Sequence, residues 1–170
     1  MTKKYQLSDI DDQWQAVHQA TLLFLCQDDK VLLIRKKRGL GAGKINGPGG
    51  KRDAGESLQQ CAVREVREEL RIEAQNPVDH GRVRFQFTDG YSIDVRIYVA
   101  SSFTGVPQET DEAIPLWFKL DEIPYAEMWE DDQIWLPRVL GGESVDGRFV
   151  FESDRMLEHA VTFDRLVQST

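Results

Sequence analysis

One segment, residues 49–73, constrains the fold of this chain more than any other, and it reads GGKRDAGESLQQCAVREVREELRIE. Ser57 and Gln60 have the S-x-x-Q spacing of a capping box, so we expect a helix to begin at Ser57. Apolar residues recur every four positions along this helix and predict a buried stripe, formed by Leu58, Ala62, Val66 and Leu70. The segment therefore predicts an amphipathic helix with one face in a core.

The same helix concentrates negative charge on one side. Glu65 and Glu69 stand one turn apart and Glu68 lies beside them, so the three carboxylates repel one another unless a cation lies between them. Gly49 and Gly50 let the preceding backbone approach closely, where a carbonyl oxygen can serve as a further ligand. The pattern predicts a site for a hard cation, Mg²⁺ or Mn²⁺. The alternative is a solvated acidic face laced with arginines.

Composition limits the classes of function. The 170 residues suit one domain with one core, and 41% hydrophobic with 29% charged residues is typical of globular proteins. No apolar run approaches the ~20 residues of a membrane-spanning helix, and the first residues lack an export signal. With only Cys26 and Cys61, which we expect to be buried thiols, a cytoplasmic protein is predicted. The net charge of -8 argues against binding of duplex nucleic acid.

The charge is unevenly distributed along the chain. Residues 35–52 hold seven of the 21 basic residues and no acid, whereas residues 53–73 are rich in acid. A basic loop joined to an acidic helix could hold an anion on one side and a divalent cation on the other. The alternative is a solvated surface of uneven charge.

Strand patterns dominate the remaining sequence. The alternation of apolar residues and the turn signals between them predict strands over 20–26, 30–38, 82–87, 91–103, 116–120, 148–152 and 157–163. The first two of these pair, 82–87 and 91–103 form a hairpin around TDG, and the last two form a closing hairpin. This is an α+β pattern around a mixed sheet.

The other segments predict helices and loops. Residues 131–140 predict a second helix with Pro137 as a candidate breaker, and residues 8–19 a short helix capped by Ser8 or Asp9. Glycine-rich residues 39–50 and residues 104–115 predict loops. We divide the chain into an N-terminal extension, residues 1–19, and a single domain, residues 20–170.

Residues 50–72 resemble the Nudix box of the Nudix hydrolases. Gly50, Glu56, the run Arg64-Glu65-Val66-Arg67-Glu68-Glu69 and Ile72 have its spacing, and every charged position fits. The usual glycine near the helix end is Arg71 here, at a position where a left-handed conformation is common. Arg71 there costs on the order of 1 kcal/mol or implies a different cap.

Three further stretches, 36–51, 111–118 and 123–137, resemble the oxidised purine nucleoside triphosphatase (8-oxo-dGTP diphosphatase) branch of that family. The resemblance covers roughly residues 20–163. It implies the Nudix fold, a mixed β-sheet in an α/β/α sandwich. It also implies Mg²⁺-dependent hydrolysis, with Mn²⁺ as a substitute, of oxidised purine nucleoside triphosphates such as 8-oxo-dGTP. The products would be a nucleoside monophosphate and pyrophosphate, which would sanitise the nucleotide pool.

The resemblance also implies roles for individual residues. The metal site would comprise Gly50, Glu65, Glu68, Glu69 and Glu112. The catalytic set would add Arg64 and Glu56 to these glutamates. The substrate would be bound by Lys36, Asn46, Phe85, Trp129, Asp131 and Asp132.

The substrate residues have plainer interpretations as well. Trp129 could stack on a purine or pack in the core. Asp131 and Asp132 could recognise the base, one of them protonated because adjacent buried carboxylates cannot both ionise cheaply, or could cap the helix. Asn46 could bind a purine edge or form a turn.

Other functions are compatible with the box. One alternative is a Nudix pyrophosphohydrolase of another nucleoside diphosphate derivative, such as 5′-triphosphate RNA, a dinucleoside polyphosphate or a nucleotide sugar. The other is a non-catalytic nucleotide-binding module, which the complete set of acids disfavours. A monomer and a homodimer are both compatible with the sequence.

Overall fold

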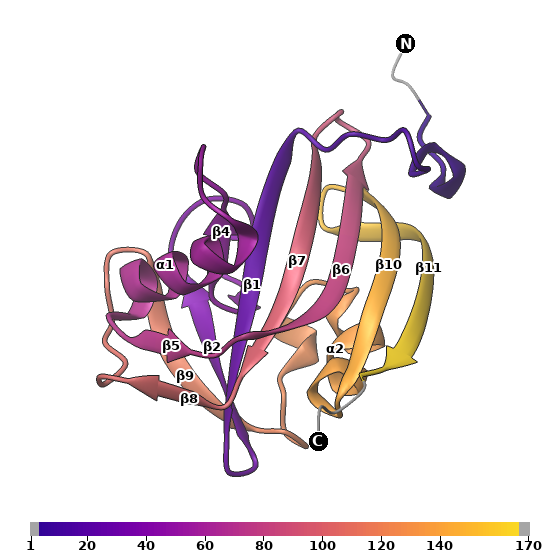
Figure 1. Cartoon of the computed structure of the whole chain (residues 1–170). Coiled ribbons are helices and arrows are strands. Elements are labelled where there is room, and N and C mark those ends of the chain that lie inside the picture. Colours follow the sequence, from indigo (N-terminus) through magenta and orange to yellow (C-terminus); the bar gives the residue numbers. More distant parts are fainter. Residues whose placement is uncertain (1–3, 167–170) are drawn as a thin grey trace.

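The structure, a computed structural model, describes residues 4–166 and places two helices on opposite sides of a twisted sheet (Figure 1). The helices are α1 (Leu58–Leu70) and α2 (Asp132–Leu140), with short 3-10 turns η1 (Leu7–Asp9) and η2 (Tyr125–Glu127). The strands are β1 (His18–Gln27), β2 (Lys30–Lys36), β3 (Ile45–Asn46), β4 (Gly49–Lys51), β5 (Glu73–Gln75), β6 (Val78–Phe87), β7 (Ser92–Ala100), β8 (Ser102–Thr104), β9 (Ala113–Lys119), β10 (Glu143–Glu152) and β11 (Arg155–Arg165).

The large sheet is mixed, as the sequence predicts. Its order is β11-β10-β6-β7-β1-β2-β3, with β4 added to β1 and β9 to β2, while β5 and β8 form a separate pair. The β1–β7 and β6–β10 pairs are parallel, and the predicted β1–β2, β6–β7 and β10–β11 pairs are antiparallel. Parallel pairing needs long connections, and these connections carry α1 and α2.

Two apolar clusters fill the two sides of the sheet. On the α1 side, Ala62, Val66 and Leu70 are buried against residues of β1 and β2, and the predicted Leu58 is only partly buried. On the α2 side, Trp135 and Phe24 belong to a larger cluster that also includes side chains of β10. No helix within residues 4–166 is long and apolar enough to cross a membrane.

Helix α1 forms for the local reasons seen in the sequence. Ser57 Oγ accepts a hydrogen bond from the Gln60 backbone at 3.0 Å, and the Gln60 side chain accepts one from the Ser57 backbone at 2.9 Å. This capping box satisfies two of the donors left free at a helix start. At the other end Arg71 has φ 61° and ψ 34°, so the left-handed conformation expected there is confirmed without a glycine.

The predicted helix over residues 8–19 is wrong. Within the described residues this segment contains only the single turn η1, and β1 already begins at His18. Asp11 Oδ1 accepts from the Gln13 backbone at 2.9 Å and thereby forms a local turn that competes with a helix. Beyond this turn, Trp14 and Val17 form hydrogen bonds with Gln86 of β6 and Ser92 of β7, so the segment lies along the sheet. Residues 1–3 of the predicted extension and 167–170 of the predicted domain lie outside the described residues.

Two predicted loops are shorter than expected. Residues 39–50 contain β3 and the start of β4, because Asn46 pairs with Ile34 of β2 and the two glycines of β4 pair with β1. Strand β9 begins at Ala113 rather than at 116, along β2. Pro115 is tolerated in β9 because that strand lies at the sheet margin.

Candidate active site

Three carboxylates meet at the junction of α1 with the loop before β9. Glu65, Glu69 and Glu112 each offer an oxygen atom, and these oxygens lie within 4.8 Å of one another. The hydroxyl of Thr110 donates to the Glu69 carbonyl oxygen at 2.7 Å and accepts from the Glu112 backbone at 3.3 Å. Thr110 therefore ties the Glu112 loop to the helix that carries the other two acids.

Glycines of β4 bring the backbone against these acids. A Cβ atom at Gly50 would lie 2.4 Å from the Glu65 carboxyl carbon, so any side chain there would displace that carboxylate. The Gly49 backbone donates to Glu69 Oε2 at 3.4 Å. The expected closeness of Gly50 to the acid cluster is thus present.

Arg64 organises the outer part of the cluster. Its guanidinium donates two hydrogen bonds of 2.7 Å to Glu56, one of 2.9 Å to Glu65 and one of 3.2 Å to Glu68. The bonds from Arg64 lower the pKa of Glu56 to about 2. Glu68 is half exposed and pairs with Arg64, so the structure does not bring it into the close group formed by the other three acids.

The two acids of the cluster that lie on α1, Glu65 and Glu69, are costly to ionise, and a bound cation would stabilise their charged forms. Burial and the neighbouring Glu65 raise the pKa of Glu69 to about 8. Burial also raises the pKa of Glu65, although Arg64 opposes that shift. Oxygen atoms from clustered carboxylates are the ligands preferred by Mg²⁺ and Mn²⁺. The residues present therefore fit a divalent cation.

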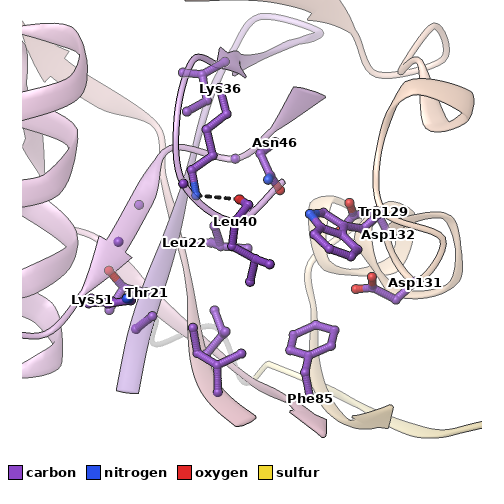
Figure 2. Close-up of a pocket in the computed structure, with 18 of the residues that line it drawn as sticks. Thr21, Leu22, Lys36, Leu40, Asn46, Lys51, Phe85, Trp129, Asp131 and Asp132 are labelled. Atoms are coloured by element: carbon purple, nitrogen blue, oxygen red, sulfur yellow. Dashed lines mark hydrogen bonds between the residues drawn. The ribbon is translucent and has the colours of Figure 1, made fainter. Parts of the chain in front are cut away.

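Two lysines connect the acid cluster with an adjacent cavity. Lys36 donates to the Leu40 carbonyl oxygen at 2.8 Å, and both Lys36 and Lys51 line the cavity (Figure 2). Burial lowers the pKa of Lys36, while Glu69 and Glu65 oppose that shift. Acidic side chains and basic side chains thus lie side by side at this end of the cavity.

The cavity of about 300 Å³ extends from these lysines to the start of α2. All six predicted substrate residues line it, namely Lys36, Asn46, Phe85, Trp129, Asp131 and Asp132. In Figure 2, Asn46 of β3 faces the cavity from one side, and Trp129 with the two aspartates faces it from the other. The volume is at the small end for a ligand cavity.

The two aspartates are buried and incompletely paired. Asp131 Oδ2 accepts from Trp135 Nε1 at 2.8 Å, while Asp131 Oδ1 and Asp132 Oδ2 are buried without a hydrogen-bond partner in the described protein. Asp131 precedes α2 but its side chain makes no capping hydrogen bond, so the capping interpretation fails for this residue. Burial raises the pKa of both carboxyl groups, and the charge of Asp131 adds to the shift of Asp132, as expected for an adjacent pair.

Aromatic side chains form the remaining wall. Trp129 meets Phe87 and Phe151 edge to face, with ring centroids 6.1 and 5.7 Å away. Lys44 Nζ lies 5.3 Å from the Trp129 ring centroid. Phe85 stacks on Phe149 at 5.3 Å. Trp129 is only half buried, so it combines core packing with a surface open to the cavity.

Several lining residues were not predicted from the sequence. These are chiefly Lys51, Phe87, Tyr91 and Trp135. Trp135 could have been found, because it follows Asp131 by four positions and so lies on the same side of the helix. Phe87 likewise alternates with the predicted Phe85 on one face of β6. Tyr91 carried no comparable signal.

A helix with clustered acids beside a cavity is the arrangement expected of a Nudix protein. Residues 16–139 match the family model described as the NUDIX domain, so the chain belongs to the Nudix family. It is 41% identical over 141 residues to the oxidized purine nucleoside triphosphate hydrolase of Danio rerio, covering 82% of this chain and 90% of that protein. It is 38% identical to the protein of the same description from Mus musculus, covering 83% of this chain and 92% of that protein. The fold matches a crystal structure of the MutT protein from Bacillus halodurans with a TM-score of 0.76 at 27% identity, covering 85% of this chain and 97% of that one. The predicted family and fold are confirmed.

Proposed function

We propose that this protein hydrolyses oxidised purine nucleoside triphosphates such as 8-oxo-dGTP, with a divalent cation, to a nucleoside monophosphate and pyrophosphate. The observation that supports this most is the position of the cavity, which extends from Gly50 and two lysines, beside the acid cluster, to a buried pair of incompletely bonded aspartates. The two hydrolases of zebrafish and mouse to which the chain is similar support the same substrate class. Removal of damaged nucleotides, in the cytoplasm, would be its role.

The acid cluster would bind the phosphates of the substrate through a divalent cation. Glu65, Glu69 and Glu112 would hold the cation, with Glu68 as an outer acid that Arg64 holds nearby. Magnesium is the ion we favour, with manganese as a substitute. Such an ion, when bound, neutralises phosphate charge and makes a nearby water more acidic. Water adds across the anhydride, so the P–O bond to the leaving pyrophosphate breaks and one proton is released.

The remaining polar residues would orient the triphosphate. Lys36 and Lys51 lie between the acids and the cavity, where they would balance the phosphate charge. Arg64 binds Glu56 and Glu65 together and would keep the latter carboxylate directed at the cation. Because the net charge is -8, these lysines alone would attract a polyanion weakly.

The aspartate pair would recognise the base. A protonated carboxyl donates a hydrogen bond while its neighbour accepts one, and Asn46 can do either. Trp129 would provide an aromatic surface for the purine, a contact worth ~1–3 kcal/mol. A site built on such paired hydrogen bonds rejects a mismatched edge, because its own buried groups would be left unpaired.

The direct test is a kinetic comparison of 8-oxo-dGTP, 2-hydroxy-dATP, the normal deoxynucleoside triphosphates and 5′-triphosphate RNA, with Mg²⁺. We expect 8-oxo-dGTP to give the highest kcat/KM and pyrophosphate as the product. Glu65→Gln and Glu69→Gln should lower kcat by orders of magnitude on every substrate while the folded state persists. Orthophosphate release, or near-normal turnover by both variants, would contradict the proposal.

The base assignment has its own test. Asp131→Asn and Asp132→Asn should change kcat/KM for 8-oxo-dGTP far more than for dGTP, whereas Glu65→Gln should lower both to a similar extent. An unchanged ratio of the two substrates in both aspartate variants would show that base selection lies elsewhere. A preference for triphosphate RNA in the wild-type protein would favour the alternative Nudix substrate instead.

A further inference from the structure

Residues 14–18, which lead into β1, are bound to one short part of the sheet. Trp14 Nε1 donates to Gln86 Oε1 at 2.9 Å, and the Val17 backbone donates to Ser92 Oγ at 2.9 Å. His18 Nδ1 and the Tyr91 hydroxyl form a hydrogen bond of 3.2 Å. All three contacts converge on the end of β6, the start of β7 and the turn between them.

Gln86 transmits this contact to the turn. Its Nε2 atom donates to the carbonyl oxygens of Phe87 at 3.0 Å and Tyr91 at 3.2 Å, while its Oε1 atom accepts from Trp14. Gln86 is only 4% exposed, so every polar atom of its amide needs a protein partner. A flipped amide would place its oxygen against two carbonyl oxygens. Trp14 therefore completes the one orientation in which Gln86 holds both carbonyls.

The two carbonyls belong to residues that form the aromatic wall of the base cavity. Phe87 and Tyr91 both line the cavity, with their ring centroids 5.9 Å apart. Phe87 in turn lies edge to face against Trp129. The backbone of Tyr91 is thus held through Gln86, and its hydroxyl is held by His18.

We propose that Tyr91 forms a wall of the cavity that binds the purine, and that Trp14, Gln86 and His18 are positioning residues that fix it. This inference depends on the proposed function, since it assigns these residues to the binding of the purine. The acid cluster is built from α1 and the loop before β9, which these contacts do not involve. Loss of the positioning contacts should therefore weaken nucleotide binding and leave the chemical step intact.

The test compares Trp14→Phe, Gln86→Met and their double variant with the wild-type protein. A net hydrogen bond contributes about 1 kcal/mol, so Trp14→Phe, which removes one, should raise KM for 8-oxo-dGTP by about fivefold with kcat within about twofold. Gln86→Met should raise KM more, because it also removes the two bonds to the carbonyl oxygens. The double variant should lose little more than Gln86→Met alone, because that change already removes the bond to Trp14. Calorimetric affinity for the product 8-oxo-dGMP should fall in parallel, without turnover.

Arg148→Gln is the matched control. Arg148 donates to the carbonyl oxygens of Leu7 and Ile10 at 3.3 and 3.5 Å, so this change loosens the same segment without touching Gln86. It should lower the melting temperature and leave KM unchanged. An equal rise of KM in Arg148→Gln would show a merely structural role and overturn the inference.

Tyr91→Phe keeps the test decisive if Trp14→Phe folds poorly, because it removes only the hydroxyl bonded to His18. We expect a smaller rise of KM of about threefold from Tyr91→Phe, and a larger one from Tyr91→Ala. Unchanged KM in all of these variants, with an active wild-type enzyme, would refute the positioning role. A wild-type protein that neither hydrolyses 8-oxo-dGTP nor binds 8-oxo-dGMP would refute the proposed function itself.

Discussion

Arg71 adopts a backbone conformation that normally favours glycine. Its φ of 61° places Cβ close to the following carbonyl oxygen, which costs roughly 1–2 kcal/mol in an L-residue. Arg71→Gly should therefore raise the free energy of unfolding by about 1 kcal/mol, after the extra entropy of glycine in the unfolded chain is subtracted. Chemical denaturation measures the gain.

Asn76 is the control for that change, because it is also exposed and has φ 51°. Asparagine tolerates the left-handed region better than arginine does. Asn76→Gly should consequently stabilise the protein less than Arg71→Gly. Equal gains at the two positions would show that backbone strain at Arg71 is not the cause.

The aspartate pair should make stability depend on pH. Burial raises the pKa of Asp131 from 3.8 to about 6, and that of Asp132 well above its ordinary value. The folded protein thus holds these protons more tightly than the unfolded chain, so the contribution of this pair to the free energy of unfolding is greatest below pH ~4 and falls as the pH rises through the folded pKa values. Asp132→Asn should remove part of this loss.

Melting temperatures between pH 4 and pH 8 test this expectation. Asp132→Asn should gain stability over the wild-type protein as the pH rises, whereas the exposed Asp121→Asn should follow the wild-type curve. A difference between wild type and Asp132→Asn that stays constant across this range would contradict the assignment of buried, proton-retaining carboxyls.

At the scale of elements, β4 contains two adjacent glycines with different roles. A Cβ at Gly49 would lie 1.9 Å from the Thr21 backbone oxygen of β1, whereas one at Gly50 would meet the Glu65 side chain. Gly49→Ala should therefore separate two strands and lower the melting temperature strongly. Gly50→Ala should displace Glu65 and reduce kcat by about tenfold or more, at little cost in stability. The reverse pattern, measured by calorimetry and kinetics, would refute the assignment.

Helix α1 could be predicted from the sequence because its determinants are local. A capping box and a four-residue apolar repeat lie within the segment itself, so no distant contact decides its structure. Residues 8–19 could not be predicted in this way. Their partners, such as Gln86, Ser92 and Arg148, are about 70–140 positions away in the sequence, and these contacts override a weak helical pattern.

The site residues also fall into two groups, those that local sequence predicts and those whose positions depend on distant contacts. Glu65 and Glu69 are neighbours on one helix, so their shared side follows from helix geometry. Glu112 comes from a distant loop, and only the family resemblance indicated it. Tyr91 acquires its position through a turn, the Gln86 amide of β6 and the His18 side chain of β1. No periodic pattern encodes such a position, so structure was needed to find it.

At the scale of the whole molecule, the acid cluster should make stability depend on divalent cations. A ligand that binds only the folded state stabilises it by mass action, so saturating Mg²⁺ should add about 1–3 kcal/mol to the free energy of unfolding. Sodium chloride at matched ionic strength is the control, because simple screening would relieve repulsion equally. Glu112→Gln should reduce the magnesium effect. Equal stabilisation by both salts would argue against a specific site.

The parallel pairing of β6 with β10 has a consequence for how the molecule is made. Phe149 and Phe151 of β10 pack on Phe85, yet β10 lies more than fifty residues beyond β6 in the chain. Closure of such distant pairs is slow, because loop entropy is lost before contacts form. During synthesis the cavity lined by Phe85 therefore stays incomplete until β10 has emerged. A nucleotide that binds this cavity can therefore stabilise the completed protein but not the nascent chain, which lacks the finished binding site.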